Sequence, residues 1–196
     1  MEKNTALGKW KEYQQQTSSG KPRPLLIKAL TYVPTRGAAL DLGAGALNDT
    51  QYLLNNGFKN VTAVDITPQF KNVSIKEGVH FEYYESSFED FRFQTQYFDL
   101  ISSQFSLPFT EKKQFPKVWR GITGGLKKGG IFCGQLFGKK DDWQNRGTVI
   151  THTSEEIAQM TKNFEVLYLG EVENDSKTAS GQQKHWHYFE LIAKKR

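Results

Sequence analysis

Cysteine is almost absent from this chain, and the shortage excludes several kinds of site. The single cysteine, Cys133, cannot form an internal disulfide, and without a second thiol neither a zinc ribbon nor a Cys-x-x-Cys redox site is possible. We expect Cys133 simply to pack in a strand. We predict no metal site.

Long hydrophobic runs are lacking as well. None approaches the length of a membrane span, and the first ten residues contain no hydrophobic signal core. We therefore predict a cytoplasmic protein that makes no membrane contact.

The chain also has no strong concentration of one charge. Its formal net charge is +5, and the lysines and arginines are spread along the 196 residues apart from a basic end at 194–196. Ordinary solubility accounts for this, although a basic chain also suits an anionic partner. With 37% hydrophobic and 13% aromatic residues, the composition is that of a folded protein of one domain.

Apolar residues recur in a pattern that predicts alternating strands and helices. A polar stretch at 1–21 is expected to be a loosely attached, flexible lead-in that closes as a lid over the ligand site of a single domain at 22–196. Strands are predicted at 38–42, 61–66, 79–84, 98–102, 131–137, 164–173 and 185–193. Helices are predicted at 22–33, 50–56, 115–126 and 153–162, with Asp49 as the N-cap of the second and a Thr153/Glu156 capping box on the last.

This alternation predicts an α/β fold with a doubly wound, mostly parallel sheet of seven strands. A short polar link at 174–183 joins the last two strands, so we expect the final strand to run antiparallel. Sheets of this kind bind ligands beyond the carboxyl ends of their strands.

Two glycines directly follow the first predicted strand. Gly43 and Gly45 stand where the chain must turn sharply and let a ligand approach the backbone. Asp65 lies 20 residues beyond Gly45, at the end of the next strand, where a carboxylate can accept both hydroxyls of a ribose. The alternatives are a plain turn at either glycine and a strand-end cap at Asp65.

Five strings of the sequence, in this order, resemble the class I, Rossmann-like methyltransferases that use S-adenosylmethionine. They are ALDLGAG (39–45), VTAVDI (61–66), FEDF (88–91), YFDLISS (97–103) and LKKGGIF (126–132). The resemblance covers residues 22–193. Within the family, the chain resembles small bacterial members, including the tellurite-resistance type. It implies a Rossmann-like fold, an enzyme of the EC 2.1.1 class and S-adenosylmethionine as cofactor.

The resemblance also implies roles for individual residues. Asp41 would orient the methionine amine and Asp65 would hold the ribose. The implied cofactor-binding set is Asp41, Gly43, Gly45, Asp65, Ile66, Ser87, Phe88 and Ser102.

The sequence departs from the family pattern at two places. Leu47 stands where many members have a further glycine, and Ser86 and Ser87 stand where an aspartate often holds the adenine amino group. Adenine is therefore expected to rest on Ile66 and Phe88, with serine or backbone partners.

The acceptor is predicted to be a small molecule. The chain after the fourth strand lacks the Asn/Asp-Pro-Pro-Tyr string with which amino-methylating enzymes of bases and glutamine hold a planar NH2. Six residues are candidates for the acceptor pocket: Trp10, Tyr13, Gln104, Phe105, Phe137 and Trp143. For the five aromatic residues among them, the alternative is ordinary packing in the core or on the surface.

Two histidines near the end of the chain are candidate bases. If the last strand is antiparallel, His185 and His187 share one face near the donor methyl, where an imidazole can accept the acceptor's proton, and Trp186 points the other way. The alternative is a pair of hydrogen-bonded sheet histidines. Two other functions remain open, an NAD-binding oxidoreductase and a non-catalytic nucleic-acid-binding module. The sequence does not indicate the oligomeric state.

Overall fold

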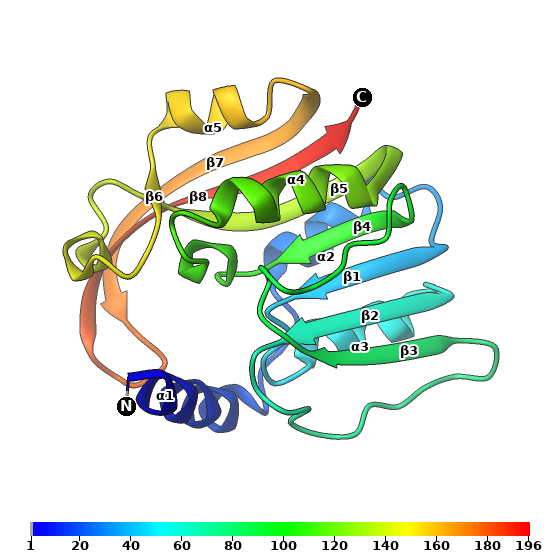
Figure 1. Cartoon of the computed structure of the whole chain (residues 1–196), viewed down its shortest axis with the longest axis horizontal. Helices are drawn as coiled ribbons and strands as arrows, with labels where there is room; N and C mark the ends of the chain where they lie inside the picture. Colours follow the sequence, from blue (N-terminus) through cyan, green and yellow to red (C-terminus); the bar gives the residue numbers. More distant parts are fainter. Residues whose placement is uncertain (1) are drawn as a thin grey trace.

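A single mixed sheet with helices on both sides forms the framework of the protein (Figure 1). The computed structural model describes residues 2–196. Its central strands follow the order β3 (His80–Glu85), β2 (Asn60–Asp65), β1 (Ala38–Leu42), β4 (Phe98–Ser103), β5 (Leu126–Gly138), β8 (Gln183–Lys195), β7 (Phe164–Lys177).

Only β8 runs against its neighbours on this path, antiparallel to both β5 and β7. An eighth strand, β6 (Thr151–His152), pairs in parallel with the end of β5. The predicted α/β class, the mostly parallel sheet and the antiparallel last strand are confirmed. The sequence missed β6 because two residues carry no periodic pattern.

The helices are α1 (Glu2–Thr17), α2 (Pro24–Leu30), α3 (Asn48–Asn55), α4 (Phe115–Gly125) and α5 (Ser154–Met160), with short 3-10 turns η1 (Leu107–Phe109) and η2 (Asp142–Arg146). The capping box is present, because the Thr153 hydroxyl accepts from Glu156 N while the Glu156 carboxylate accepts from Thr153 N.

Two regions near the start of the chain differ from the sequence analysis. Most of the stretch 1–21 forms helix α1, where no helix was predicted. Asp49 does not cap α3, because its carboxylate accepts from Arg23 N at 2.7 Å. The N-cap position belongs to Leu47, which is fully buried in the left-handed conformation at φ 63°.

Apolar side chains cover both faces of the sheet. On one face, residues of α4 and α5 such as Trp119 and Ile157 pack against β1, β4, β5 and β8. On the other face, α2 and α3 pack against the same strands, where Cys133 is fully buried as predicted. This two-sided burial explains why the central strands carry apolar side chains on both of their faces.

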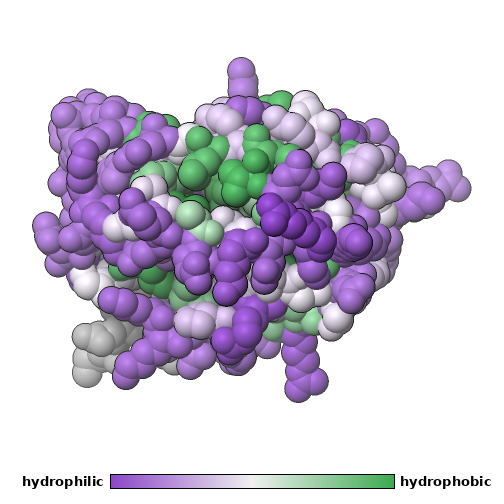
Figure 2. Space-filling view, turned by 90° about the horizontal axis from the view of Figure 1, so that it is seen from above, coloured by the Kyte–Doolittle hydropathy of each residue, from purple (hydrophilic) through white to green (hydrophobic). Residues whose placement is uncertain are grey.

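The surface seen from above Figure 1 is mostly hydrophilic, with its largest hydrophobic area near the middle and smaller ones below it (Figure 2). Some large apolar side chains are exposed, such as Ile75 and Leu169, as is normal for a folded protein. Over residues 2–196, none of the helices combines the length and the apolar character needed to cross a membrane.

The strands end at the edge where the predicted site should lie. The β7–β8 hairpin is longer than expected, since β7 continues to Lys177 and β8 begins at Gln183. Figure 1 shows this hairpin curving away from the sheet toward α1, beyond the carboxyl ends of the other strands. The hairpin and α1 therefore flank the ligand-binding edge of the sheet.

Candidate active site

The turn between β1 and α3 requires glycine at its first position. Gly43 has φ +80°, and a Cβ added there would lie 2.2 Å from the Cβ of Ser106. Gly45 also has a positive φ, +49°. The loop therefore carries no side chain at Gly43 and Gly45, which lets other groups approach its backbone closely, as Ser106 does at Gly43.

Asp41 is a buried acid at the carboxyl end of β1. Its side chain is 1% exposed and accepts a hydrogen bond from Thr50 Oγ1 at 2.6 Å. Burial, with the nearby charge of Asp49, raises the pKa of Asp41 to about 8. A cation such as an ammonium group would favour the charged carboxylate, so this site fits the amine of an amino acid.

Asp65 joins the end of β2 to the glycine loop. One carboxylate oxygen accepts from Gly45 N at 2.9 Å, and the other accepts from Thr67 N and Thr67 Oγ1 at 3.0 and 2.7 Å. An ionised carboxylate offers about four acceptor positions, so these three bonds leave capacity for a hydroxyl of a ribose.

The remaining predicted cofactor residues lie in different surroundings. Phe88 packs on the glycine loop, its ring 3.4 Å from the Cβ position of Gly43, and Ile66 is 41% exposed. Ser87 is bonded to the Asp90 carboxylate. Ser102 lies opposite Asp41 in the sheet, but it is fully buried and its hydroxyl accepts from the Gln104 amide. Phe88 and Ile66 therefore offer apolar surface that fits an adenine, whereas Ser102 lies inside the sheet.

Helix α1 is docked on the same loop. The Gln14 side chain is 3% exposed, and its amide donates to Gly45 O at 3.0 Å and to Thr67 Oγ1. Asn48 holds the end of the helix by donating to Thr17 O at 2.8 Å. The stretch expected to be loosely attached therefore touches the same loop as Asp65.

Aromatic side chains gather beside this loop, and we call this group the aromatic cluster. Its members are Trp10, Phe105, Phe109, Phe137, Trp143, Trp186 and Tyr188. Neighbouring rings of the cluster have centroids 4.9 to 6.5 Å apart. Tyr13 packs against Trp10, and its hydroxyl accepts from Arg23 at 3.0 Å.

Phe105 connects the cluster to the glycine loop. It has the left-handed φ of 54°, which is rare for a bulky residue and is found mostly at functional sites. Its ring lies against Tyr188 at 4.9 Å, while the next residue, Ser106, packs on Gly43 and donates to Leu42 O. The cluster and the cofactor loop are therefore direct neighbours.

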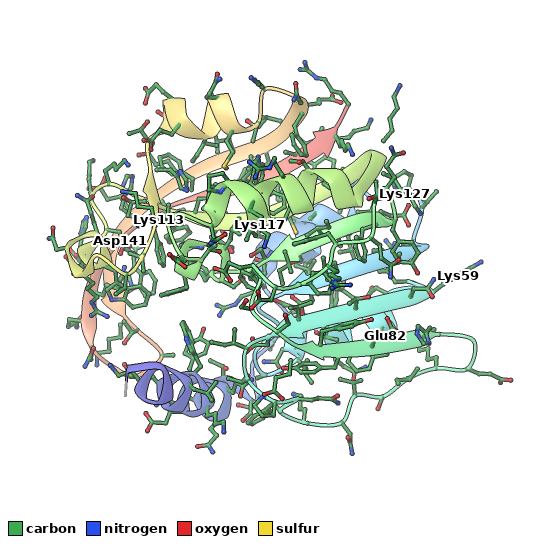
Figure 3. The ribbon with its side chains drawn as sticks, in the orientation of Figure 1. Lys59, Glu82, Lys113, Lys117, Lys127 and Asp141 are labelled. Carbon is green, nitrogen blue, oxygen red and sulfur yellow. The ribbon has the colours of Figure 1, made fainter. Side chains whose placement is uncertain are left out.

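A buried ion pair lies within the aromatic cluster. The side chains of Lys184 and Asp141 are 2% and 0% exposed, and the ammonium donates to the carboxylate. The Lys184 nitrogen lies 3.8 Å from the ring centroid of Trp186 and 4.5 Å from that of Trp143. Burial lowers the pKa of Lys184. Figure 3 shows Asp141 at the hairpin side of the sheet, opposite the end where Lys127 lies.

The histidines face away from this cluster, so the predicted orientation was wrong. His185 Nδ1 lies 2.8 Å from the Asp175 carboxylate, and this contact raises the pKa of the imidazole and holds the ring on the side of β7. His187 is buried between Lys140 N, which donates to its Nδ1, and the Glu171 carboxylate at 2.8 Å. The residue between them, Trp186, is the one that contacts Phe105. The structure matches the alternative of hydrogen-bonded sheet histidines.

Five residues at this edge were not recognised as site candidates in the sequence: Phe109, Asp141, Lys184, Trp186 and Tyr188. The alternation of the last strand already places Trp186 and Tyr188 on one face. No local pattern predicts the Asp141–Lys184 pair, because only the tertiary structure brings these two residues together. Within residues 2–196, the structure shows no group of three or more side chains arranged to hold a metal ion.

Comparisons with known proteins agree with this geometry. Residues 40–134 match the family model described as a methyltransferase domain. No curated protein matches the sequence. The fold resembles TehB from Haemophilus influenzae, with TM-score 0.72 and 16% identity over 87% of this chain and 61% of TehB.

Two further solved structures share the fold. One is a chain of the complex between the Haloferax volcanii Trm112 methyltransferase activator and a putative methyltransferase, with TM-score 0.71 and 14% identity over 96% of this chain and 95% of that one. The other is the Burkholderia thailandensis 1,6-didemethyltoxoflavin-N1-methyltransferase with bound 1,6-didemethyltoxoflavin and S-adenosylhomocysteine, with TM-score 0.65 and 20% identity over 88% and 77%.

The sheet order, the glycine loop and the family match define the class of the protein. The chain carries a methyltransferase domain with the fold of the class I, S-adenosylmethionine-dependent enzymes. Its cofactor is S-adenosylmethionine, which the buried Asp41, the glycine loop and Asp65 fit. The resemblance to class I methyltransferases that was identified from the sequence is therefore confirmed.

Proposed function

We propose that this enzyme, of the EC 2.1.1 class, methylates a small-molecule acceptor that binds against the aromatic cluster. The observation that carries the proposal is that two consecutive residues contact both parts of the site. Phe105 packs in the aromatic cluster, and Ser106 packs on Gly43 of the glycine loop. An acceptor among these rings would lie next to the cofactor. The Burkholderia thailandensis neighbour, whose structure holds 1,6-didemethyltoxoflavin, is consistent with a small acceptor.

The residues of this chain would mainly bind and orient. S-adenosylmethionine supplies an already activated methyl group when bound, so the protein needs to align the acceptor and exclude water. Asp41 would hold the amine of the cofactor and Asp65 its ribose. Helix α1, which contributes Gln14 to the loop and Trp10 to the cluster, would separate the site from solvent. No base is assigned to His185 or His187.

Cofactor binding is tested by calorimetry with S-adenosylhomocysteine. Replacing Asp65 by Ala removes charge-assisted hydrogen bonds and should weaken binding by on the order of 1.5 to 3 kcal/mol. Glu165→Gln, at an exposed position on β7, is the matched control and should bind like the parent. Binding of NAD in place of S-adenosylhomocysteine would contradict the proposal.

The acceptor class is tested with methyl-labelled S-adenosylmethionine. A cell extract is separated into small molecules and macromolecules, and each fraction is incubated with the enzyme and the labelled cofactor. We expect label in the small-molecule fraction. Label confined to nucleic acid or protein would overturn the small-molecule assignment while leaving the methyltransferase class intact.

A further inference from the structure

The indole N–H of Trp186 has no hydrogen-bond partner. In the part of the chain that the structure describes, this nitrogen is buried and no protein atom accepts its proton. Buried donors are almost always paired, so an unpaired one calls for an explanation. An indole N–H only donates, so the missing partner must be a hydrogen-bond acceptor.

The surroundings of Trp186 define the kind of molecule that carries this acceptor atom. Its ring lies in the aromatic cluster, with centroids 5.4 Å from Trp143 and 6.0 Å from Phe105. Aromatic walls favour a planar aromatic molecule, stacked or edge-on. The ammonium of Lys184, 3.8 Å from the ring centroid of Trp186, disfavours a cationic one.

The indole is held firmly in place. The backbone N–H groups on either side of it donate to two neighbouring carboxylates. His185 N donates to Asp142 at 2.7 Å, and His187 N donates to Asp141 at 3.1 Å. Lys184, paired with Asp141, covers the ring itself. Because its backbone is held on both sides and Lys184 packs on its ring, the indole N–H has a fixed direction. A donor with a fixed direction is suited to selecting among ligands.

We propose that Trp186 determines acceptor specificity in this enzyme. Its indole N–H donates to a ring nitrogen or carbonyl oxygen of a neutral or anionic planar aromatic acceptor bound in the aromatic cluster. The proposal rests on the proposed function and adds the substrate class and the residue that recognises it. Because the rings are in contact in this structure, the acceptor enters as Trp10 and its helix separate from Phe109.

The test uses two probes of nearly equal shape. Quinoline carries a ring nitrogen that accepts a hydrogen bond, and naphthalene has carbon at the same position. Each is added to the full-length enzyme with S-adenosylhomocysteine bound, and the indole N–H signals of its tryptophans are followed by NMR. Trp186→Phe assigns the Trp186 signal.

We expect the Trp186 indole proton to move downfield with quinoline and not with naphthalene. In Trp186→Phe, affinity for quinoline should fall about fivefold relative to naphthalene, the equivalent of one hydrogen bond. Trp119→Phe is the matched control, since Trp119 donates to Met160 O outside the cluster. It should leave the affinities for both probes unchanged.

The outcomes separate this inference from the proposed function. Equal shifts of the Trp186 signal with both probes, or equal affinity losses in Trp186→Phe, would overturn the recognition role. If S-adenosylhomocysteine binds but neither probe does, the aromatic acceptor class is wrong and the methyltransferase function stands. If S-adenosylhomocysteine itself fails to bind, both proposals fall.

Discussion

Replacing Asp141 by Asn should strongly destabilise the protein, because it leaves a charge buried without its partner. The Lys184 side chain is 2% exposed and that of Asp141 is fully buried. Breaking a buried ion pair by removing one partner typically costs about 3–5 kcal/mol. The other contact of the ammonium with a protein oxygen is a 3.2 Å hydrogen bond to His185 O. We therefore expect a loss within this range at neutral pH.

The penalty should shrink as the pH rises. Burial already lowers the pKa of Lys184 below its ordinary value of 10.5, and Asp141 acts to raise it. Removing Asp141 lowers that pKa further. Between the folded-state pKa and 10.5 the unfolded chain binds more protons than the folded one, so the free energy of unfolding rises with pH. In Asp141→Asn this window extends further toward neutral pH than in the parent.

Urea unfolding at several pH values measures both effects. The double variant Asp141→Asn/Lys184→Met should recover most of the stability, because Met fills similar volume among the rings without a charge. Glu173→Gln removes the partner of an exposed lysine, Lys140, and should change stability little. A stable Asp141→Asn protein, or a penalty independent of pH, would refute the description of Lys184 as a buried charge.

Four further predictions concern the loop and the helices. Affinity for S-adenosylhomocysteine, measured by calorimetry, should increase from about pH 6 to about pH 8 as Asp41 ionises, and Asp41→Asn should flatten this dependence. Thr153→Ala should lower the free energy of unfolding by about 1 kcal/mol through loss of the capping box. Leu47→Gly should be more stable to urea than Leu47→Ala by about 1 kcal/mol, because residue 47 has a left-handed backbone. S-adenosylhomocysteine should slow proteolysis of the segment 18–22 if α1 closes as a lid, and Gln14→Ala should speed it; equal rates with and without the ligand would count against a lid.

Most of the sheet could be predicted because its strands are buried on both faces. Runs such as 38–42 and 98–102 are mostly apolar, and each is followed by a polar or glycine position that marks the turn. The alternation of strands and helices then allows few topologies. Helix α1 was missed for the opposite reason: its sequence is polar, and it is held by hydrogen bonds from Gln14 and Asn48 that no local pattern reveals.

The cofactor loop was predictable to a similar extent. Position 43 must be glycine because its φ is positive and Ser106 lies close to it. A glycine directly after a strand can be recognised in the sequence, so this turn was predictable. Leu47 shows the limit of that reasoning. It adopts a left-handed conformation without being glycine, and full burial of its side chain offsets the strain.

The error over the histidines shows which part of the site depends on tertiary structure. Strand alternation fixes that Trp186 lies on the face opposite His185 and His187, but it does not say which face meets the other aromatic rings. That choice is made by contacts distant in sequence. Asp141 and Asp142 accept the N–H groups of β8, and Asp141 pairs with Lys184. Together these contacts hold the start of β8 with the indole toward Phe105 and the imidazoles toward the acids of β7. The ion pair whose loss is expected to destabilise the protein therefore also determines which side chains can reach a bound acceptor.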